Sequence, residues 1–297
     1  MLYRNLGHSG LIVSTIGMGC ATFGRESDRQ TSLLIMDHAF GQGITLFDTA
    51  EAYGQGASEL VVGEWLQSRN LRDKIILATK VNGTLTRQRI LSSVESSLKR
   101  LRTDCIDLLQ THVWDESTPL EETLDALTTL VQQGKVRHVG CSNYSASQLA
   151  EALSLSTETG LSRMVSVQPP YNLVQRDIEA DLLPLCASEN VGVISYSPLA
   201  AGFLTGKYRP GEAIPPGTRF DVIPGHQDIY FTEHGYRVLE LLDKEAQASG
   251  VSHVQSALSW VLKQPGITSV LIGARKTSQI DQALSASDSA AHQTRNP

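Results

Sequence analysis

The chain alternates eight times between short apolar segments rich in β-branched residues and longer segments with the periodicity of amphipathic helices. Short apolar segments of this kind predict buried strands. They cover residues 16–20, 44–50, 75–80, 106–112, 138–143, 165–171, 192–198 and 269–274. A regular strand–helix alternation without a linker favours one parallel sheet whose faces are covered by helices.

Eight such units favour an α/β fold of the (β/α)8 TIM-barrel type. A Rossmann fold usually uses about six strands and divides at a switch point. We therefore predict a single barrel domain over residues 1–297, with approximately residues 288–297 forming a polar tail. Residues 6–13 predict an N-terminal β-hairpin that plugs the bottom of the barrel. The Gly- and Pro-rich stretch 200–230 predicts a long functional loop after strand seven.

Capping-box patterns mark three expected helix starts. The pairs are Thr118 with Glu121, Ser145 with Gln148, and Ser252 with Gln255. In the first of them, Pro119 is expected at the first helical position.

The composition excludes several classes of function. A net charge of −6 opposes non-specific binding to nucleic acid or to anionic membranes, which requires a basic surface. Residues 1–5 have no apolar leader segment, and no stretch approaches the ~18 apolar residues of a membrane span. We expect a cytoplasmic protein. Among the histidines, His112 alone lies at a strand end, so we predict no metal site.

Polar residues follow three consecutive predicted strands, and active sites of such barrels lie at the carboxyl ends of the strands. Lys80 ends an apolar strand, where a cation is costly to bury unless it is paired, and Asp48 on the neighbouring strand is its natural partner. Tyr53 follows Asp48 closely, and a cation beside it is expected to lower the phenol pKa. With His112 to orient a carbonyl oxygen, these residues predict a proton donor for a carbonyl that receives a hydride.

Longer ordered motifs surround these four residues. They are residues 6–11 with 16–19, 47–54 followed by Ser58, Glu59 and Gly63, 134–143, and 195–199 continuing to 202–208. Together they resemble the aldo-keto reductase family over nearly the whole chain, particularly its bacterial and potassium-channel β-subunit-like branch. The resemblance implies that Tyr53 is the general acid, that Lys80 and Asp48 tune it, and that His112 orients the carbonyl.

The resemblance also implies a nicotinamide cofactor. Ser142, Asn143 and Gln168 match residues that bind the nicotinamide carboxamide, and Tyr196 matches the aromatic that stacks on the ring. Arg275 precedes a helix start and is expected, with help from Lys276, to bind an adenosine 2′-phosphate, which favours NADPH/NADP+ over NADH. The complete expected cofactor site is Thr22, Phe23, Asp48, Ser142, Asn143, Gln168, Tyr196, Ser197, Pro198, Leu199, Gly202, Leu204, Gly206, Lys207, Arg209, Ile272, Gly273, Ala274, Arg275, Gln279 and Gln282.

Two features depart from the family pattern. Gln282 and Ala283 stand where relatives commonly carry an acidic residue and Asn near the adenine, and the chain ends early. The expected substrate pocket is formed by Phe23, Tyr53, His112 and Trp114.

The predicted activity is reduction of an aldehyde or ketone by NADPH, with a small-molecule carbonyl as the partner. One alternative is a nicotinamide-binding regulatory or partner-binding subunit, and another is the same chemistry run backwards as a sugar or polyol dehydrogenase. The four-residue set favours catalysis, because a pure binding module needs no proton donor.

Overall fold

Eight parallel strands close into a barrel within residues 1–293, the part of the chain that this computed structural model describes, with side chains given for residues 1–286. Each strand pairs with the next in chain order, and the last pairs with the first. The strands are β3 (Ile16–Gly19), β4 (Leu46–Asp48), β5 (Ile76–Val81), β6 (Ile106–Thr111), β7 (Val136–Ser142), β8 (Met164–Gln168), β9 (Gly192–Ser195) and β10 (Ile267–Ile272). The predicted (β/α)8 barrel is therefore confirmed.

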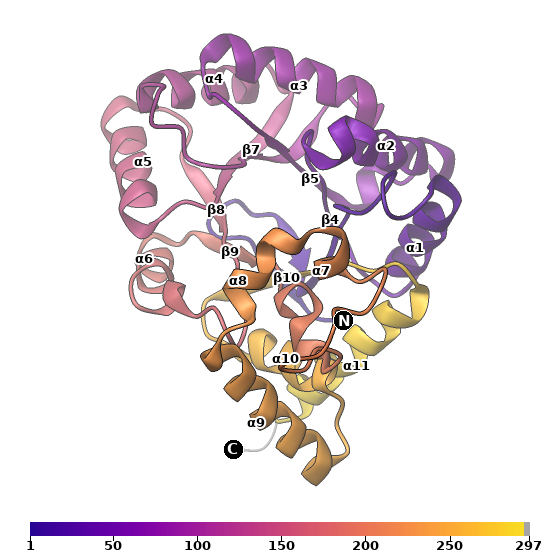
Figure 1. Cartoon of the computed structure of the whole chain (residues 1–297). Helices are drawn as coiled ribbons and strands as arrows, with labels where there is room; N and C mark the ends of the chain where they lie inside the picture. The colour runs from indigo at the N-terminus through magenta and orange to yellow at the C-terminus, as the bar shows by residue number, and fades with distance from the viewer. Residues whose placement is uncertain (294–297) are drawn as a thin grey trace.

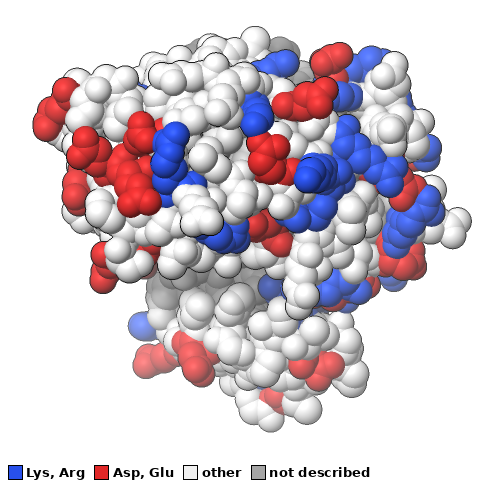
Figure 2. Space-filling model, turned by 90° about the horizontal axis from the view of Figure 1, so that it is seen from above, with Lys and Arg blue, Asp and Glu red and all other residues white. Residues whose placement is uncertain are grey.

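Helices surround the strands, as Figure 1 shows for α1 to α6. They are α1 (Arg29–Gly41), α2 (Ala57–Arg69), α3 (Arg87–Leu101), α4 (Leu120–Gln132), α5 (Ala146–Thr159), α6 (Leu182–Glu189), α9 (Glu233–Ser249), α10 (His253–Lys263) and α11 (Thr277–Gln293). None of the helices in residues 1–293 combines the length and the apolar content that a bilayer span requires. On the face shown in Figure 2, Lys and Arg side chains lie among Asp and Glu side chains.

Adjacent strand residues point to opposite sides of the barrel wall, as strand geometry requires. Leu46 and Leu108 belong to the cluster that fills the barrel interior, whereas their neighbours Phe47 and Leu109 pack in the larger cluster beneath the helices. The next inward positions, two residues along each strand, are therefore Asp48 on β4 and Gln110 on β6. The order of side chains along each strand thus puts apolar residues low in the barrel and polar residues at its upper end.

An N-terminal hairpin closes the bottom of the barrel as predicted, but it extends over residues 3–14, beyond the predicted residues 6–13 at both ends. Its antiparallel strands are β1 (Tyr3–Asn5) and β2 (Ile12–Ser14). Leu6 and Val13 are fully buried in the interior cluster. Gly7 has φ 53°, and a Cβ there would lie 2.6 Å from the carbonyl oxygen of Val165, so a glycine is required for this close approach.

The stretch 200–230 is more ordered than the sequence indicated. It contains η4 (Ala200–Thr205), α7 (Arg219–Val222), η5 (Pro224–His226) and α8 (Gln227–Tyr230). Phe203, Tyr208, Phe220 and Tyr230 are buried in a cluster of their own, which also includes Leu239 of α9. We call this set the aromatic cluster. It gives the segment a hydrophobic core separate from that of the barrel.

Two of the three predicted capping boxes are confirmed. Ser145 and Ser252 each accept a hydrogen bond from the backbone three residues on, and the glutamine there bonds back. The box at Thr118 is wrong, because Pro119 is the N-cap residue and makes no side-chain cap. The Thr118 hydroxyl donates instead to Asp115, at 2.6 Å. The hydroxyl that was expected to cap the helix is thus bound by the Asp115 carboxylate.

The C-terminal region differs from the polar tail predicted for approximately residues 288–297. Helix α11 continues through Gln293, so residues 288–293 are helical. Residues 294–297 lie outside the described part of the chain.

Close packing of α2 on α3 provides a test of the fold. A Cβ on Gly63 would lie 2.2 Å from the carbonyl oxygen of Arg100, so Gly63→Ala must push two helix backbones apart. We expect a loss of roughly 1–3 kcal/mol in the free energy of unfolding, although alanine is the better helix former.

Gly41→Ala is the matched control, because a Cβ at that helical position meets no atom within 4 Å. Urea unfolding followed by circular dichroism measures both variants. Equal stability of the two variants would contradict the packing argument.

Candidate active site

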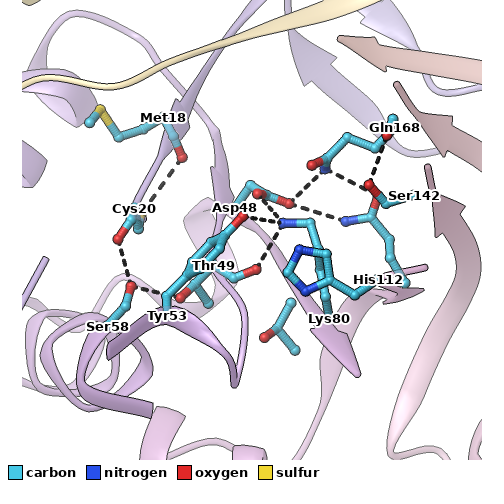
Figure 3. A network of polar contacts seen from close by, with 12 residues as sticks. Met18, Cys20, Asp48, Thr49, Tyr53, Ser58, Lys80, His112, Ser142 and Gln168 are labelled. Carbon is cyan, nitrogen blue, oxygen red and sulfur yellow. Dashed lines mark hydrogen bonds and ion pairs between the residues drawn. The ribbon is translucent and has the colours of Figure 1, made fainter. Parts of the chain in front are cut away.

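A buried ion pair between Lys80 and Asp48 lies at the upper end of the barrel interior. The Lys80 Nζ is 2.5 Å from Asp48 Oδ2, and neither side chain is more than 2% exposed. Nζ also donates to the carbonyl oxygen of Thr49, at 3.1 Å, and to the Tyr53 hydroxyl, at 3.3 Å. These three acceptors match the three hydrogens of the ammonium. Figure 3 shows the side chains of Tyr53, Lys80 and His112 gathered beside Asp48.

The ion pair determines the charge of Lys80. Burial acts to lower the pKa of this lysine, but the carboxylate of Asp48 and the hydroxyl of Tyr53 outweigh burial and raise it. Lys80 is therefore a permanent cation near neutral pH.

Tyr53 keeps its proton more firmly than the sequence indicated. Burial raises the pKa of its phenol, and the opposing effect of the Lys80 cation does not cancel this rise. The prediction of a lowered phenol pKa is thus wrong. Because the Tyr53 oxygen accepts from Lys80, its own O–H remains available for another acceptor. Tyr53 can act as an acid at neutral pH.

His112 is a neutral imidazole beside Tyr53. The two rings are 5.8 Å apart between centroids and almost perpendicular. Burial, and then the Lys80 cation, lower the pKa of His112 to about 4. A neutral imidazole carries one N–H, with which it can donate to a carbonyl oxygen.

The segment that carries Tyr53 is fastened to the next strand–helix unit. The carboxylate of Glu51 accepts from the backbone N–H of Asn82, from Arg89 and from the hydroxyl of Ser93, at 2.6–2.7 Å. This set of three bonds, which we call the Glu51 anchor, spans the β5–α3 connection and helix α3. It restrains the tyrosine two residues away.

Two buried amides complete the surroundings of Asp48. Its Oδ1 accepts from Gln168 Nε2 at 2.9 Å and from Gln110 Nε2 at 3.1 Å. Gln168 Nε2 also lies 3.2 Å from Gln110 Oε1. The Asp48 carboxylate thus accepts three hydrogen bonds, one on Oδ2 from Lys80 and two on Oδ1 from the amides, and its buried charge is compensated.

The residues expected at the nicotinamide end lie together next to this network. Ser142 donates to the carbonyl oxygen of Gln168 at 2.8 Å. Asn143 donates to the carbonyl oxygen of His112 at 2.9 Å and accepts from the Tyr196 hydroxyl at 2.8 Å. Its φ of 58° lies in the left-handed region, which Asn tolerates better than most residues. Residues at the carboxyl ends of β6, β7, β8 and β9 thus meet where the resemblance expects the nicotinamide.

Cations from the 200–230 segment and from the residues after β10 lie near one another. The pKa of Lys207 is lowered by burial and by the charge of Arg275. The pKa of Arg219 is lowered by burial and by Arg25 and Arg275, and Glu26 and Tyr53 oppose this shift. Mutual repulsion of this kind is relieved when an anion binds between the cations. We call Lys207, Arg219 and Arg275 the cationic cluster.

The loop between β9 and α7 carries several residues with left-handed backbone. Gly202 and Gly206 have φ values of 94° and 81°, which glycine adopts without strain, and Ser197 has 54°. Pro198, Leu204, Ile272 and Ala274 are buried, Leu199 is partly buried, and Gly273 is exposed. Thr22 is also partly buried. For the buried members of the predicted site, a cofactor contact would be made by the main chain.

Several expected side chains have other partners. Phe23 is fully buried in the main core, so its predicted place in the substrate pocket and the cofactor site is wrong for its side chain. Arg209 bonds to Asp243 at 3.1 Å and faces α9 instead of the loop.

The predicted adenine-end glutamines are also engaged. The Gln279 side chain accepts from the backbone N–H groups of Arg275 and Lys276, and it thereby caps the start of α11. Gln282 lies 3.4 Å from the hydroxyl of Ser252.

Trp114 is half-buried and packs edge-on against Tyr144, with ring centroids 5.0 Å apart. It follows His112 by two residues at the end of β6. Its role in a substrate pocket stays a prediction.

Two residues of the site were missed from the sequence. Gln110 lies two residues after Leu108 on the same strand, and strand alternation is the signal that could have placed it on the inward side. Arg219 follows a Pro-Pro-Gly-Thr stretch in the long loop, and no sequence signal placed it near Arg275.

Comparison with known proteins agrees with this geometry. A model of the Aldo/keto reductase family matches residues 15–293. The chain is 37% identical to "Aldo-keto reductase YhdN" of Bacillus subtilis (strain 168), over 95% of this chain and 87% of that protein. It is 34% identical to a "Probable voltage-gated potassium channel subunit beta" of Arabidopsis thaliana, over 97% of this chain and 92% of that protein. It is 36% identical to "L-glyceraldehyde 3-phosphate reductase" of Escherichia coli (strain K12), over 96% of this chain and 87% of that protein.

The charge of His112 can be measured directly. We expect its imidazole to titrate near pH 4, against an ordinary value of 6.5, in an NMR pH titration assigned with His112→Asn. Between these two values the unfolded chain binds a proton here that the folded protein does not. Stability from this group is complete above pH 6.5 and is lost as the pH falls towards 4. A measured pKa at or above 6.5 would exclude a neutral, desolvated His112.

Proposed function

The chain belongs to the aldo/keto reductase family, and from this premise we propose that it reduces aldehyde or ketone carbonyls to alcohols with NADPH. The observation that carries the proposal is the arrangement of Lys80, Asp48 and Tyr53. It leaves one hydroxyl proton, that of Tyr53, available beside a fixed cation.

The proposed chemistry divides between hydride and proton. A bound NADPH supplies the hydride that is transferred to the carbonyl carbon. Tyr53 donates its proton to the carbonyl oxygen, and Lys80 stabilises the phenolate that forms, since it already donates to that oxygen. Neutral His112 donates a hydrogen bond to the same carbonyl oxygen and orients it. Asp48 holds the Lys80 ammonium in place throughout.

The residues at hand fit a nicotinamide dinucleotide. The side-chain oxygen Oε1 of Gln168 accepts no hydrogen bond from the described residues, so it is available to the carboxamide. The Tyr196 ring is half-buried at the end of β9 and is available for stacking. At the other end, the cationic cluster suits phosphate groups. The guanidinium of Arg275 can bind a 2′-phosphate, and this supports NADPH over NADH.

Two other functions compete with this one. The relative described as a potassium channel subunit favours a nicotinamide-binding regulatory role. A regulatory role does not require Lys80 or Tyr53 to be arranged for proton transfer, and their arrangement favours catalysis. A sugar or polyol dehydrogenase would use the same residues in reverse, with Tyr53 accepting the proton.

Tyr53→Phe tests the proposed proton donor. We expect the variant to bind NADPH as the wild type does but to reduce carbonyls about 10²–10⁴-fold more slowly, because general-acid help is lost. NADPH absorbance followed with a panel of aldehydes gives the rate, and fluorescence titration gives the affinity. Unchanged turnover would remove Tyr53 from the mechanism. A wild type that binds NADPH and reduces no carbonyl would support the regulatory alternative.

Arg275→Ala tests the cofactor preference. We expect NADPH to bind about tenfold more weakly or worse, and NADH to bind as before, because one charge-assisted contact to the 2′-phosphate is lost. Arg237→Ala is the control, since Arg237 is an exposed residue of α9 that lies 3.9 Å from Glu233. An equal loss for both cofactors would assign Arg275 to a phosphate that they share.

A further inference from the structure

We propose that Gln110 is a positioning residue that orients the amide of Gln168 towards the cofactor and helps to hold Asp48. The inference rests on the proposed function, since it concerns the nicotinamide end of the same site. It names a residue that the sequence motifs did not include.

Gln110 occupies an unusual place for an uncharged polar side chain. It is fully buried on β6, opposite Lys80 of β5 in the strand register. It stands directly above Leu108 on the inward side of the barrel wall. An amide in such a place is costly unless its hydrogen bonds are made.

Its hydrogen bonds form a triangle with Gln168 and Asp48. Gln110 Nε2 donates to Asp48 Oδ1 at 3.1 Å, and Gln110 Oε1 accepts from Gln168 Nε2 at 3.2 Å. The third side is the bond from Gln168 Nε2 to Asp48 Oδ1, at 2.9 Å. An ionised carboxylate only accepts hydrogen bonds, so both amides must turn their NH2 groups towards it.

The triangle determines which atom of Gln168 remains available. Both N–H bonds of Gln168 are used, one by Asp48 and one by Gln110. Its Oε1 is therefore left to accept a hydrogen bond, and the carboxamide of nicotinamide presents an NH2 donor. Without Gln110, one N–H of Gln168 has no partner in the triangle, and the competing orientation of the amide becomes less unfavourable.

Two variants of Gln110 separate orientation from simple packing. Gln110→Met has similar length and makes neither hydrogen bond. Gln110→Glu makes both while its carboxyl is protonated, because that group donates and accepts. When the new carboxyl is ionised, it can only accept hydrogen bonds, and its negative charge then lies beside the negative charge of Asp48. The charged groups beside this position are Asp48 and Lys80, and burial together with Asp48 is expected to raise the pKa of the new carboxyl.

The measurements are the NADPH dissociation constant and the single-turnover rate of hydride transfer between pH 5.5 and 9. We expect Gln110→Met to bind NADPH about tenfold more weakly at every pH. Gln110→Glu should match the wild type at the acid end and approach the Met variant as the pH rises. Thermal unfolding shows that each variant is folded, and the Glu variant alone suffices if the Met variant is not.

Thr111→Val is the matched control. Thr111 is the next residue of β6, is also buried, and donates to the Tyr144 hydroxyl on the other side of the wall. The variant should lose stability and keep the NADPH affinity of the wild type.

The same pH-independent affinity in both Gln110 variants, or wild-type affinity in Gln110→Met, would overturn the proposal. A wild type that binds NADPH without reducing carbonyls would overturn the catalytic function and leave this inference standing, because the primary measurement is of cofactor binding. A wild type that does not bind NADPH would overturn both.

Discussion

The ion pair of Lys80 and Asp48 is the interaction on which the rest of the site depends. Removing two charges from water costs several kcal/mol for each ion, and attraction compensates only when the remaining hydrogen-bonding positions are also satisfied. Here the ammonium has three acceptors and the carboxylate has two further amide donors. Tyr53, Gln110 and Gln168 therefore contribute to the stability of the pair, and the pair in turn fixes where each of them points.

The barrel explains how residues distant in sequence reach one carboxylate. In parallel strands of matched register, inward positions two residues apart form successive layers. On each of the three strands the inward residue two positions earlier is apolar, namely Leu46, Ala78 and Leu108. In the register Lys80 pairs with Gln110, and Asp48 pairs with Ala78. The strands that build the core therefore also position the polar site. No separate element is required to bring these three residues together.

Much of this architecture could be predicted from the sequence, because strand alternation and two of the helix caps are local patterns. The positions of Asp48, Tyr53, Lys80 and His112 also followed from strand ends and motifs. The predictions that failed depended on burial and on side-chain contacts, which local sequence patterns do not show. Burial reversed the expected pKa shift of Tyr53. Asp115 accepts the hydrogen bond of the Thr118 hydroxyl, and Asp243 accepts that of Arg209. Phe23 is buried in the main core.

The two ends of the proposed cofactor site are supported by different parts of the molecule. The proposed proton donor, Tyr53, is held by the barrel wall and by the Glu51 anchor, whereas Arg219 of the cationic cluster is carried by a segment built around the aromatic cluster. Two separately packed parts of one domain thus support the proposed site. Replacement of residues 200–230 as one block, with its aromatic residues kept together, is a route to altering cofactor preference while leaving the proton-transfer machinery intact.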